Sequence, residues 1–435
     1  MQSSLITEGI YRLSAHIHTI LFEGIWPLPQ GMTMNSYIVQ GKDIAIIDGV
    51  CGWDGVPETL FQQFDQLGLS VGDIRYVVLN HMEPDHTGWL EPLKKITRGF
   101  ELVATPRALR LAKSFFGLDE TFCTLHPVKS GDRIDLGRGK VLQFEEIPNV
   151  HWPETMATYE QSTQTLFSCD AFGSFGAVPD STPSDDLLSE KLLTHFEQEA
   201  IRYYANIVAA FYLPVLKAIE KLRPLPIRIL APGHGLVWKK DPGRIITLYQ
   251  RLAEQTPAPK EKGITLLWTG PSSTLSPLIG EITQKMHNAS IPLYVHRVPP
   301  THVSYILSSI LRSSVVILGL PPFVTELPSP LAHILDDLGR KKIGGRTFFC
   351  LRANLQTKNT RSSDLSLLEQ DLETINPFTE TAGSCIEEEI AQISRKYQVR
   401  WEVVSYSGSL SLQENFELSI HPRNHKENPA LTLAG

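Results

Sequence analysis

Four side chains that can bind metal ions lie within six residues of one another. They are His81, Glu83, Asp85 and His86. Imidazole and carboxylate groups are the ligands that iron, zinc and related divalent ions commonly take from proteins. A single histidine is usually an ordinary core or surface residue, whereas this density of histidine and acid is far more typical of a metal site.

Three further candidate ligands, His151, Asp170 and His234, occur downstream in a similar local context. Each follows a run of residues typical of a strand, as the first cluster follows the apolar run 76–79. Because each side chain sits where a strand ends and a loop opens, it can turn toward a common point. The elements that must position the site are therefore a set of buried strands whose ends lie together.

These seven residues resemble the ligands of the flavodiiron proteins (A-type flavoproteins), a branch of the metallo-β-lactamase superfamily. The superfamily pattern H-x-H-x-D-H here becomes H-x-E-x-D-H, with Glu83 in the second histidine position, which is the diiron variant. The neighbourhoods at 35–37, expected before a first strand, and at 151–153 and 170–173 are also similar. The likeness covers roughly residues 1–260, with all seven ligand positions filled in order.

The resemblance implies two non-haem irons. One would be held by His81, Glu83 and His151, the other by Asp85, His86 and His234, with Asp170 as the bridge. Two imidazoles and a carboxylate with open positions are typical of non-haem iron that reacts with dioxygen. Two metals about 3.5–4 Å apart can hold both atoms of a diatomic ligand. A dizinc hydrolase of the same fold is the alternative, and Glu83 argues against it because a further carboxylate favours iron cycling over static zinc.

Two aromatic residues are candidates for a role beside the metals. Tyr203 and Tyr204 lie in a segment similar to the helix that borders the metal pocket in the family. One of them could donate a hydrogen bond to a bound diatomic molecule, and the alternative is that both are packing residues of a helix. Trp152 is expected to pack under the site.

Composition indicates an ordinary globular chain. Its 435 residues are enough for two or three domains, and 42% are hydrophobic and 20% charged. The formal net charge of −7 gives no indication of nucleic acid or an anionic membrane as partner. We expect a cytoplasmic protein without a signal peptide or membrane span, whose five widely spaced cysteines are free thiols. The absence of C-x-x-C pairs excludes a built-in rubredoxin module.

A domain boundary is expected at the proline-, charge- and glycine-containing stretch 257–263, which reads as a stiff linker. The predicted fold is α/β (α+β), with a metallo-β-lactamase-like αββα sandwich at 1–256 and a divergent flavodoxin-like, doubly wound parallel sheet at 264–408. A loose tail follows at 409–435. In the second domain, strands are expected at 264–268, 292–296, 314–319, 346–351 and 399–406, and helices at 275–287, 302–311, 327–338 and 384–396. This alternation is typical of βαβ units and a parallel sheet.

The first turn of the second domain could bind the phosphate of FMN. Thr269, Ser272, Ser273 and Thr274 lie between the first strand and the first helix, where hydroxyls and backbone N–H groups suit a phosphate. Serine and threonine are also plain helix caps, so the turn alone is weak support. In the second flavin loop only Phe323 could stack on the ring, and the third loop has no glycine that would allow close approach.

The resemblance implies an oxidoreductase that reduces dioxygen to water, nitric oxide to nitrous oxide, or both. Electrons would come through FMN from a rubredoxin-like or flavoprotein donor. Because the flavin of one subunit serves the irons of another in this family, a head-to-tail homodimer or a dimer of dimers is implied. The alternative function is a diiron sensor or adaptor for oxygen or nitric oxide that has lost FMN, which the divergent flavin loops favour.

Overall fold

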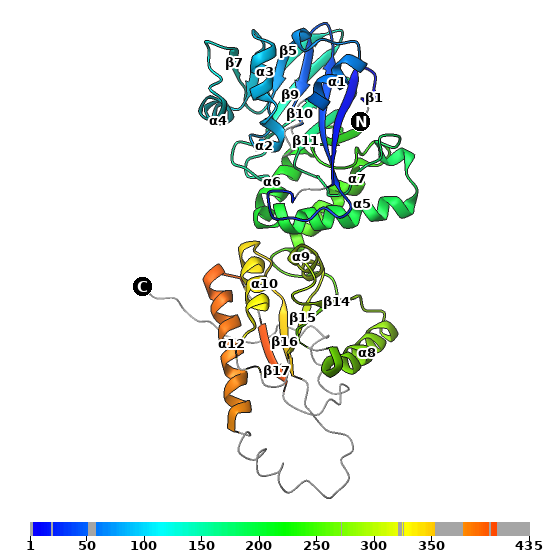
Figure 1. Cartoon of the computed structure of the whole chain (residues 1–435). Helices are drawn as coiled ribbons and strands as arrows, with labels where there is room; N and C mark the ends of the chain where they lie inside the picture. Colours follow the sequence, from blue (N-terminus) through cyan, green and yellow to red (C-terminus); the bar gives the residue numbers. More distant parts are fainter. Residues whose placement is uncertain are drawn as a thin grey trace, which may run out of the picture.

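The chain folds into two lobes joined by a short connection (Figure 1). The computed structural model describes residues 3–18, 21–50, 58–270, 272–320, 324, 326–352, 377–399 and 402–406. The N-terminal lobe ends with helix α7 (Pro242–Gln255), and the C-terminal lobe begins with strand β13 (Ile264–Trp268). Among the helices of the described residues, none is both long and apolar enough to cross a membrane.

Two sheets form the centre of the N-terminal lobe. The first has seven strands in the order β1 to β7: Ser4–Thr7, Ile10–Ile17, Met32–Gln40, Ile44–Ile47, Ile74–Val78, Glu101–Ala104 and Thr124–Pro127. The second has five, in the order β12-β11-β10-β9-β8, with bounds from β8 to β12 of Arg133–Gly137, Lys140–Glu146, Met156–Glu160, Thr165–Cys169 and Ile229–Pro232. Neighbours from β4 to β7 run parallel, as do β11 and β12, and the other pairs are antiparallel.

The two sheets pack face to face because alternate side chains of their strands are apolar. Tyr37 and Val39 of β3 and Tyr76 and Val78 of β5 belong to one buried cluster with Phe144, Phe167 and other residues of the second sheet. Side chains in a strand alternate between its two faces, so the residues between them point the other way. Those residues, such as Ile38 and Val77, belong to the outer core.

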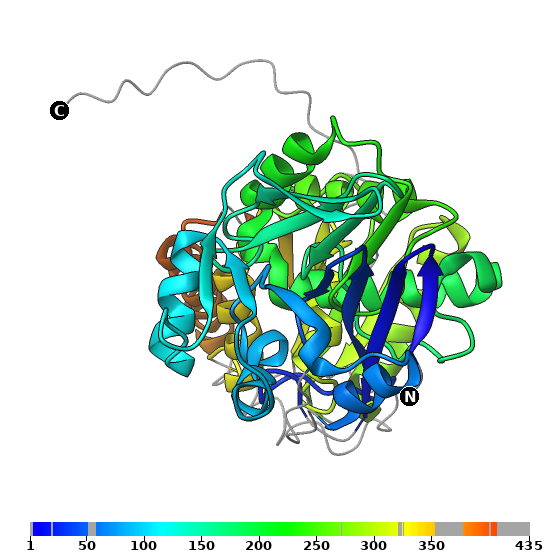
Figure 2. The same cartoon turned by 90° about the horizontal axis from the view of Figure 1, so that it is seen from above.

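Helices cover the outer faces and complete the αββα sandwich, as Figure 2 shows from above. Helices α1 (Glu58–Gln66), α3 (Leu90–Ile96) and α4 (Pro106–Phe116) lie on the first sheet. Helices α5 (Glu190–Tyr203), α6 (Tyr212–Leu222) and α7 lie on the second. Between α5 and α6 the chain makes a π-helix, η3 (Tyr204–Val208), and a short 3-10 turn.

The C-terminal lobe is a parallel five-stranded sheet in the order β14-β13-β15-β16-β17. Its further strands are Leu293–Arg297, Val315–Leu320, Thr347–Arg352 and Glu402–Tyr406, and its helices α8, α9, α10 and α12 are Ser272–Asn288, Val303–Leu311, Ser329–Arg340 and Pro377–Tyr397. Helix α8 packs on one face, and α9, α10 and α12 on the other. This strand order and two-sided helix cover are those of a flavodoxin-like fold.

The predicted fold class is confirmed, with one local error. Every strand and helix expected after residue 264 is present, and the ends shift by a few residues, most at α12, which begins at Pro377 instead of 384. The stretch 35–37 does not precede a first strand but lies in the middle of the third, β3. The prediction was wrong because the strands before it, β1 and β2, were not expected. The proposed domain limits stay predictions.

One buried arginine on each side of the junction ties the lobes together. Arg202 at the end of α5 donates to Ser304 Oγ (3.3 Å) in α9 and to the carbonyl of Pro27 (3.1 Å), and its guanidinium stacks between the rings of Phe175 and Tyr305. Arg346, just before β16, donates to six backbone carbonyls, and three of them come from the ends of helices.

The carbonyls of Gln255 (2.9 Å) and Thr256 (2.6 Å) come from the end of α7, and that of Leu311 (2.7 Å) ends α9. Helix C-termini carry partial negative charge, so two of them converge on one cation. Arg346 thereby binds the last helix of the N-terminal lobe to the sheet of the other lobe.

Candidate metal centre

The candidate ligands lie at one end of the sandwich, where four strands stop. His81 and Glu83 follow β5, and Asp85 and His86 lie in the short helix α2 (Pro84–Thr87). His151 lies between β9 and β10, Asp170 directly after β11, and His234 two residues after β12. The structure thus brings together residues that are up to 153 positions apart.

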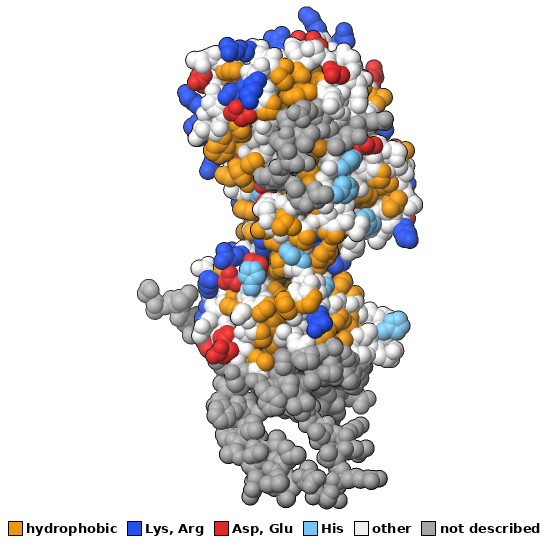
Figure 3. Space-filling view, viewed as in Figure 1, with side chains coloured by type: hydrophobic (Ala, Val, Ile, Leu, Met, Phe, Trp, Pro, Cys, Tyr) orange, Lys and Arg blue, Asp and Glu red, His pale blue; other side chains and the backbone are white. Residues whose placement is uncertain are grey.

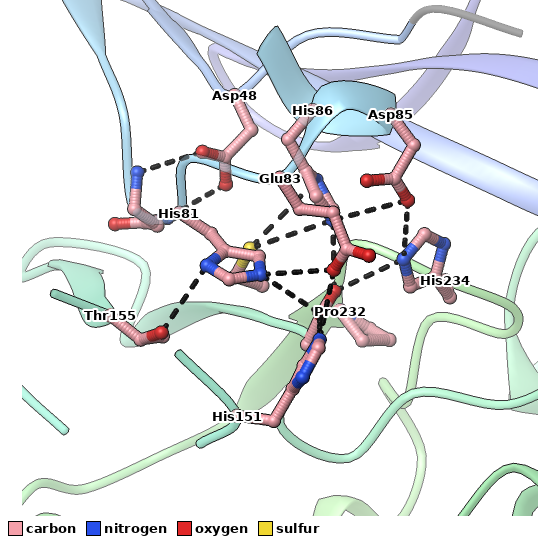
Figure 4. Close-up of polar contacts among 12 residues, drawn as sticks. Asp48, His81, Glu83, Asp85, His86, His151, Thr155, Pro232 and His234 are labelled. Carbon is pink, nitrogen blue, oxygen red and sulfur yellow. Dashed lines mark hydrogen bonds and ion pairs between the residues drawn. The ribbon is translucent and has the colours of Figure 1, made fainter. Parts of the chain in front are cut away.

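Three of the candidates make one group of facing donor atoms, which we call position 1. Glu83 Oε2 lies 3.2 Å from His81 Nε2 and 2.9 Å from His151 Nε2. The same two nitrogens lie 3.4 and 3.0 Å from Asp170 Oδ2. All four side chains are buried, and their donor atoms form a cluster that could hold an ion. Figure 4 shows His81, Glu83 and His151 directed at one another.

The other three candidates make a second group, position 2. Asp85 Oδ2 lies 3.2 Å from His234 Nε2 and 3.5 Å from His86 Nε2. Asp170 Oδ1 lies 2.9 Å from His86 Nε2 and 3.0 Å from His234 Nε2. One oxygen of Asp170 therefore faces each position, which is the geometry of a bridging carboxylate.

The residues present fit two metal ions. Two donor atoms about 2.1 Å from one ion, at tetrahedral or octahedral angles, lie about 3.0–3.4 Å apart, close to the spacing seen here. Both oxygens of Asp85, Oδ2 of Asp170 and Nε2 of His234 are buried and, despite their short contacts, make no hydrogen bond of good geometry among the described residues. Buried polar atoms are normally satisfied, so these atoms point to missing cationic partners.

Charge also favours cations at this centre. Burial alone would lower the pKa of His81, but the charge of Asp170 and hydrogen bonds to Glu154 and Glu83 raise it to about 10. Against the same effect of burial, carboxylates raise the pKa of His234 to about 10 and the pKa values of His86 and His151 to about 9. The carboxylates thus hold positive charge on all four imidazoles, and metal ions would take the place of those protons.

Close packing at glycine and asparagine residues fixes the ligand loops. A Cβ on Gly233 would meet His86 Cε1 at 2.8 Å, so only glycine allows this approach. Asn35 in β3 donates from Nδ2 to the carbonyls of Pro232 (3.0 Å) and Gly235 (2.9 Å), on either side of His234. This explains why the Asn35 neighbourhood belongs with the site although it carries no ligand.

Comparison with known proteins agrees with this geometry. The sequence model described as ODP family beta lactamase matches residues 32–235. A nitric oxide reductase of Moorella thermoacetica is 29% identical over 342 residues, 78% of this chain and 82% of that protein. An anaerobic nitric oxide reductase flavorubredoxin of Aliivibrio fischeri is 29% identical over 315 residues, 72% of this chain. The rubredoxin oxygen:oxidoreductase of Desulfovibrio gigas has the same fold, with a TM-score of 0.76 at 20% identity over 96% of both chains.

The chain is similar to the flavodiiron proteins in sequence and in fold. It spans only 61% of the length of the Aliivibrio flavorubredoxin, so the activity of that whole protein is not carried over here. The matched sequence model, over residues 32–235, includes all seven candidate ligands.

The two candidate tyrosines differ in placement. Tyr203 is fully buried beside the centre, its ring 5.7 Å from that of His234, and its hydroxyl has no hydrogen-bond partner among the described residues. Tyr204 faces away: its hydroxyl lies 3.3 Å from Thr256 Oγ1, and its ring packs against Tyr249. Tyr203 therefore remains the candidate for a hydrogen bond to a bound diatomic molecule, whereas Tyr204 packs against Tyr249. Trp152 packs edge-on against His81, 5.1 Å between ring centroids.

Several residues that support the ligands were not singled out from the sequence. Glu154 Oε1 lies 3.1 Å from His81 Nδ1, and Asp48 accepts hydrogen bonds from the backbone and side chain of Asn80 (2.7 and 3.0 Å). Burial, and then the charge of nearby Glu83 at position 1, raise the pKa of the Glu23 carboxyl to about 7. Only the position of Glu154, three residues after His151, offered a signal in the sequence.

The flavin candidates lie at the expected edge of the C-terminal sheet. Thr269 follows β13, and 272–274 form the first turn of α8, whose side chains are not described. Gly270 between them has a φ of +98°, which favours glycine at this turn. Because β13 lies between β14 and β15, the turn is at the point where the strand order reverses, where such sheets bind ligands. Phe323 lies outside the described residues.

Proposed function

We propose that this chain is a flavodiiron oxidoreductase that reduces dioxygen to water, couples nitric oxide to nitrous oxide, or does both. The observation that carries the proposal is the bridging geometry of Asp170 between two donor groups, each of two imidazoles and one carboxylate. Two ferrous ions there would supply electrons and open coordination positions for a diatomic molecule. The nitric oxide reductases among its relatives support the same activity.

The protein's own residues hold and enclose this centre. Asp170 and the terminal carboxylates Glu83 and Asp85 offset much of the charge of two divalent ions. Position 2 is closed from solvent, with exposures of 1% or less for its ligands, whereas His151 of position 1 is 8% exposed. Access for a small molecule is therefore expected from the His151 side.

Electrons would enter through FMN bound at the turn formed by Thr269, Ser272, Ser273 and Thr274. Backbone N–H groups at the N-terminus of the 17-residue helix α8 suit the phosphate. Proteins similar to this chain are named flavorubredoxin and flavoprotein, which supports a flavin as the cofactor. An outside donor, a rubredoxin-like protein or a flavoprotein reductase, would reduce it in the cytoplasm.

A head-to-tail homodimer, or a dimer of dimers, would bring the flavin of one copy to the metals of another. The loop that carries Glu23, beside position 1, exposes Leu21 (49%) and Ile25 (54%). Hydrophobic side chains gather on the surface around the junction of the lobes (Figure 3). Apolar patches of this kind often mark protein contacts, which supports a second copy covering this face.

Flavin content and turnover test the proposed function together. Purified protein should release near one FMN per chain on denaturation, as identified by chromatography. After chemical reduction, the iron-loaded protein should consume oxygen, or consume nitric oxide with formation of nitrous oxide measured by gas chromatography.

Absence of flavin even after incubation with FMN, together with tight binding of nitric oxide without turnover, would instead favour the sensor or adaptor. Stoichiometric zinc with thioester or lactam cleavage would favour the dizinc hydrolase. Glu83 in place of a histidine argues against that hydrolase, because it adds negative charge at position 1.

Replacing Tyr203 by Phe should slow turnover while leaving iron content unchanged. The buried Tyr203 hydroxyl is free to donate to a molecule bound at the metals, and loss of one such donor costs on the order of tenfold or more in rate. Tyr204→Phe is the matched control, since its hydroxyl lies at Thr256. Equal rates for Tyr203→Phe and the unchanged protein would show that Tyr203 only packs.

A further inference from the structure

The two metal positions differ in what holds the second ring nitrogen of their histidines. A histidine that binds a metal through Nε2 keeps its proton on Nδ1 and needs an acceptor there. At position 1, His81 Nδ1 lies 3.1 Å from Glu154 Oε1. At position 2, His234 Nδ1 is buried and has no hydrogen-bond partner among the described residues.

Glu154 is held firmly in this contact. It is 3% exposed, and the backbone N–H of Met82 donates to the same Oε1 at 3.1 Å. The Thr105 hydroxyl donates to the Glu154 carbonyl at 3.2 Å, which anchors the backbone of the same residue. The carboxylate therefore meets His81 in a fixed geometry, with Thr155 Oγ1 (3.3 Å from Nδ1) beside it.

Position 2 has no comparable acceptor. The His234 ring is bordered by the rings of Phe22 and Tyr203, each 5.7 Å away between centroids. The nearest recorded partner of His86 Nδ1 is the thiol of Cys169, at 3.8 Å, which is a weak acceptor. Asp48 offers an oxygen within 4.8 Å of a His86 ring nitrogen, but its hydrogen bonds are those from Asn80, and none joins it to His86 among the described residues.

We propose that Glu154 is a positioning residue that makes the two metal positions unequal, so that position 1 binds its ion first and more tightly. A carboxylate on Nδ1 fixes the tautomer and orientation of the imidazole and makes Nε2 a stronger donor. The unsatisfied Nδ1 of His234 weakens position 2 by the opposite effect. The inference rests on the proposed function only in requiring two ions, and it holds whether or not the chain turns over a substrate.

Binding of Co²⁺ alone to metal-free protein, followed anaerobically by calorimetry, tests the inequality. The unchanged protein should bind two ions per chain in two steps, the first at least about tenfold tighter. Asp85→Asn should remove the second step and keep the first, which assigns the tight step to position 1. Glu154→Gln keeps the shape of the side chain and removes its charge, and it should weaken the first step about 10–100-fold while the second stays within about twofold.

The matched control is Glu101→Gln, which neutralises a carboxylate paired with a histidine outside the centre (Oε2 to His126 Nδ1, 3.0 Å). It should leave both steps unchanged. Circular dichroism of the metal-free variants checks their fold. If Glu154→Gln does not fold without metal, Thr155→Val removes the other oxygen beside His81 Nδ1 and should weaken the first step by a smaller factor.

Three outcomes would overturn the inference. They are two steps of equal affinity in the unchanged protein, loss of the tight step in Asp85→Asn, and an unchanged first step in the Glu154 variant (or in Thr155→Val where that one is used). Failure of the proposed function would look different: two unequal cobalt steps would persist in a protein that binds no FMN and reduces neither gas.

Discussion

Asp170→Ala should leave the purified protein with less than about one tenth of its iron at both positions, because one carboxylate serves two ions. Its oxygens lie within 3.4 Å of the Nε2 atoms of all four ligand histidines, Oδ1 toward position 2 and Oδ2 toward position 1. Without it each ion loses a ligand, and the remaining carboxylates no longer balance the charge. Iron analysis of protein purified without added metal, with circular dichroism as a check of the fold, measures the effect.

Glu83→Ala is the control variant for Asp170→Ala. Among the described residues, the Glu83 carboxylate hydrogen-bonds to His81 and His151, so its loss should mainly weaken position 1 and leave about one iron per chain. Equal retention of two irons in Asp170→Ala would falsify the bridging role. Equal loss from both variants would mean that the two ions bind only as a pair.

Arg346→Met should lower the free energy of unfolding by about 3–5 kcal/mol, the usual effect of breaking a buried charged network. The Arg346 side chain is fully buried and donates to six backbone carbonyls, and no carboxylate of the described residues pairs with it. Burial lowers the pKa of its guanidinium to about 9. Methionine would fill part of the space but leave the carbonyls of Gln255 and Thr256 without a donor.

Urea unfolding measures this prediction. Fluorescence and circular dichroism followed together should give a lower midpoint, and the two signals should separate if the lobes come apart before they unfold. Arg340→Met is the control, because Arg340 is exposed and its salt bridge, to Asp336, lies within one helix. An unchanged midpoint in Arg346→Met would mean that the carbonyls find other donors and that the junction does not depend on this residue.

The C-terminal lobe was the most predictable part of the fold. Its strands and helices are short segments with a clear change of period, and the expected strand at 264–268 agrees with β13 at both ends. Strands β1 and β2 escaped prediction because the polar residues Arg12 and Ser14 of β2 interrupt the apolar pattern, although both are buried. Burial of such residues depends on what the rest of the chain places over them, which no local pattern records.

The candidate ligands could be chosen from the sequence, because the residue types, their order and their position after apolar runs carry the chemistry of the site. His81, Glu83, Asp85 and His86 are close in sequence and had to be close in space. That His151, Asp170 and His234 meet them was an expectation from the resemblance. Their approach to within about 3 Å depends on how the second sheet packs on the first.

Tertiary structure alone decided the surroundings of the ligands. Two adjacent tyrosines look alike in the sequence, yet the buried Tyr203 hydroxyl lies within the electrostatic reach of Asp170, whereas the Tyr204 hydroxyl lies 3.3 Å from Thr256 Oγ1. Glu154 lies beside His81 Nδ1 only in the folded chain, because the two residues are 73 positions apart in the sequence. The sequence by itself indicated the candidate ligands and the two folds, through residue type, the period of the second domain and the resemblance of its motifs to a known family. Which side chains support, enclose and distinguish the two metal positions was decided by long-range packing, because hydrogen bonds and buried volume act between residues that the sequence keeps far apart.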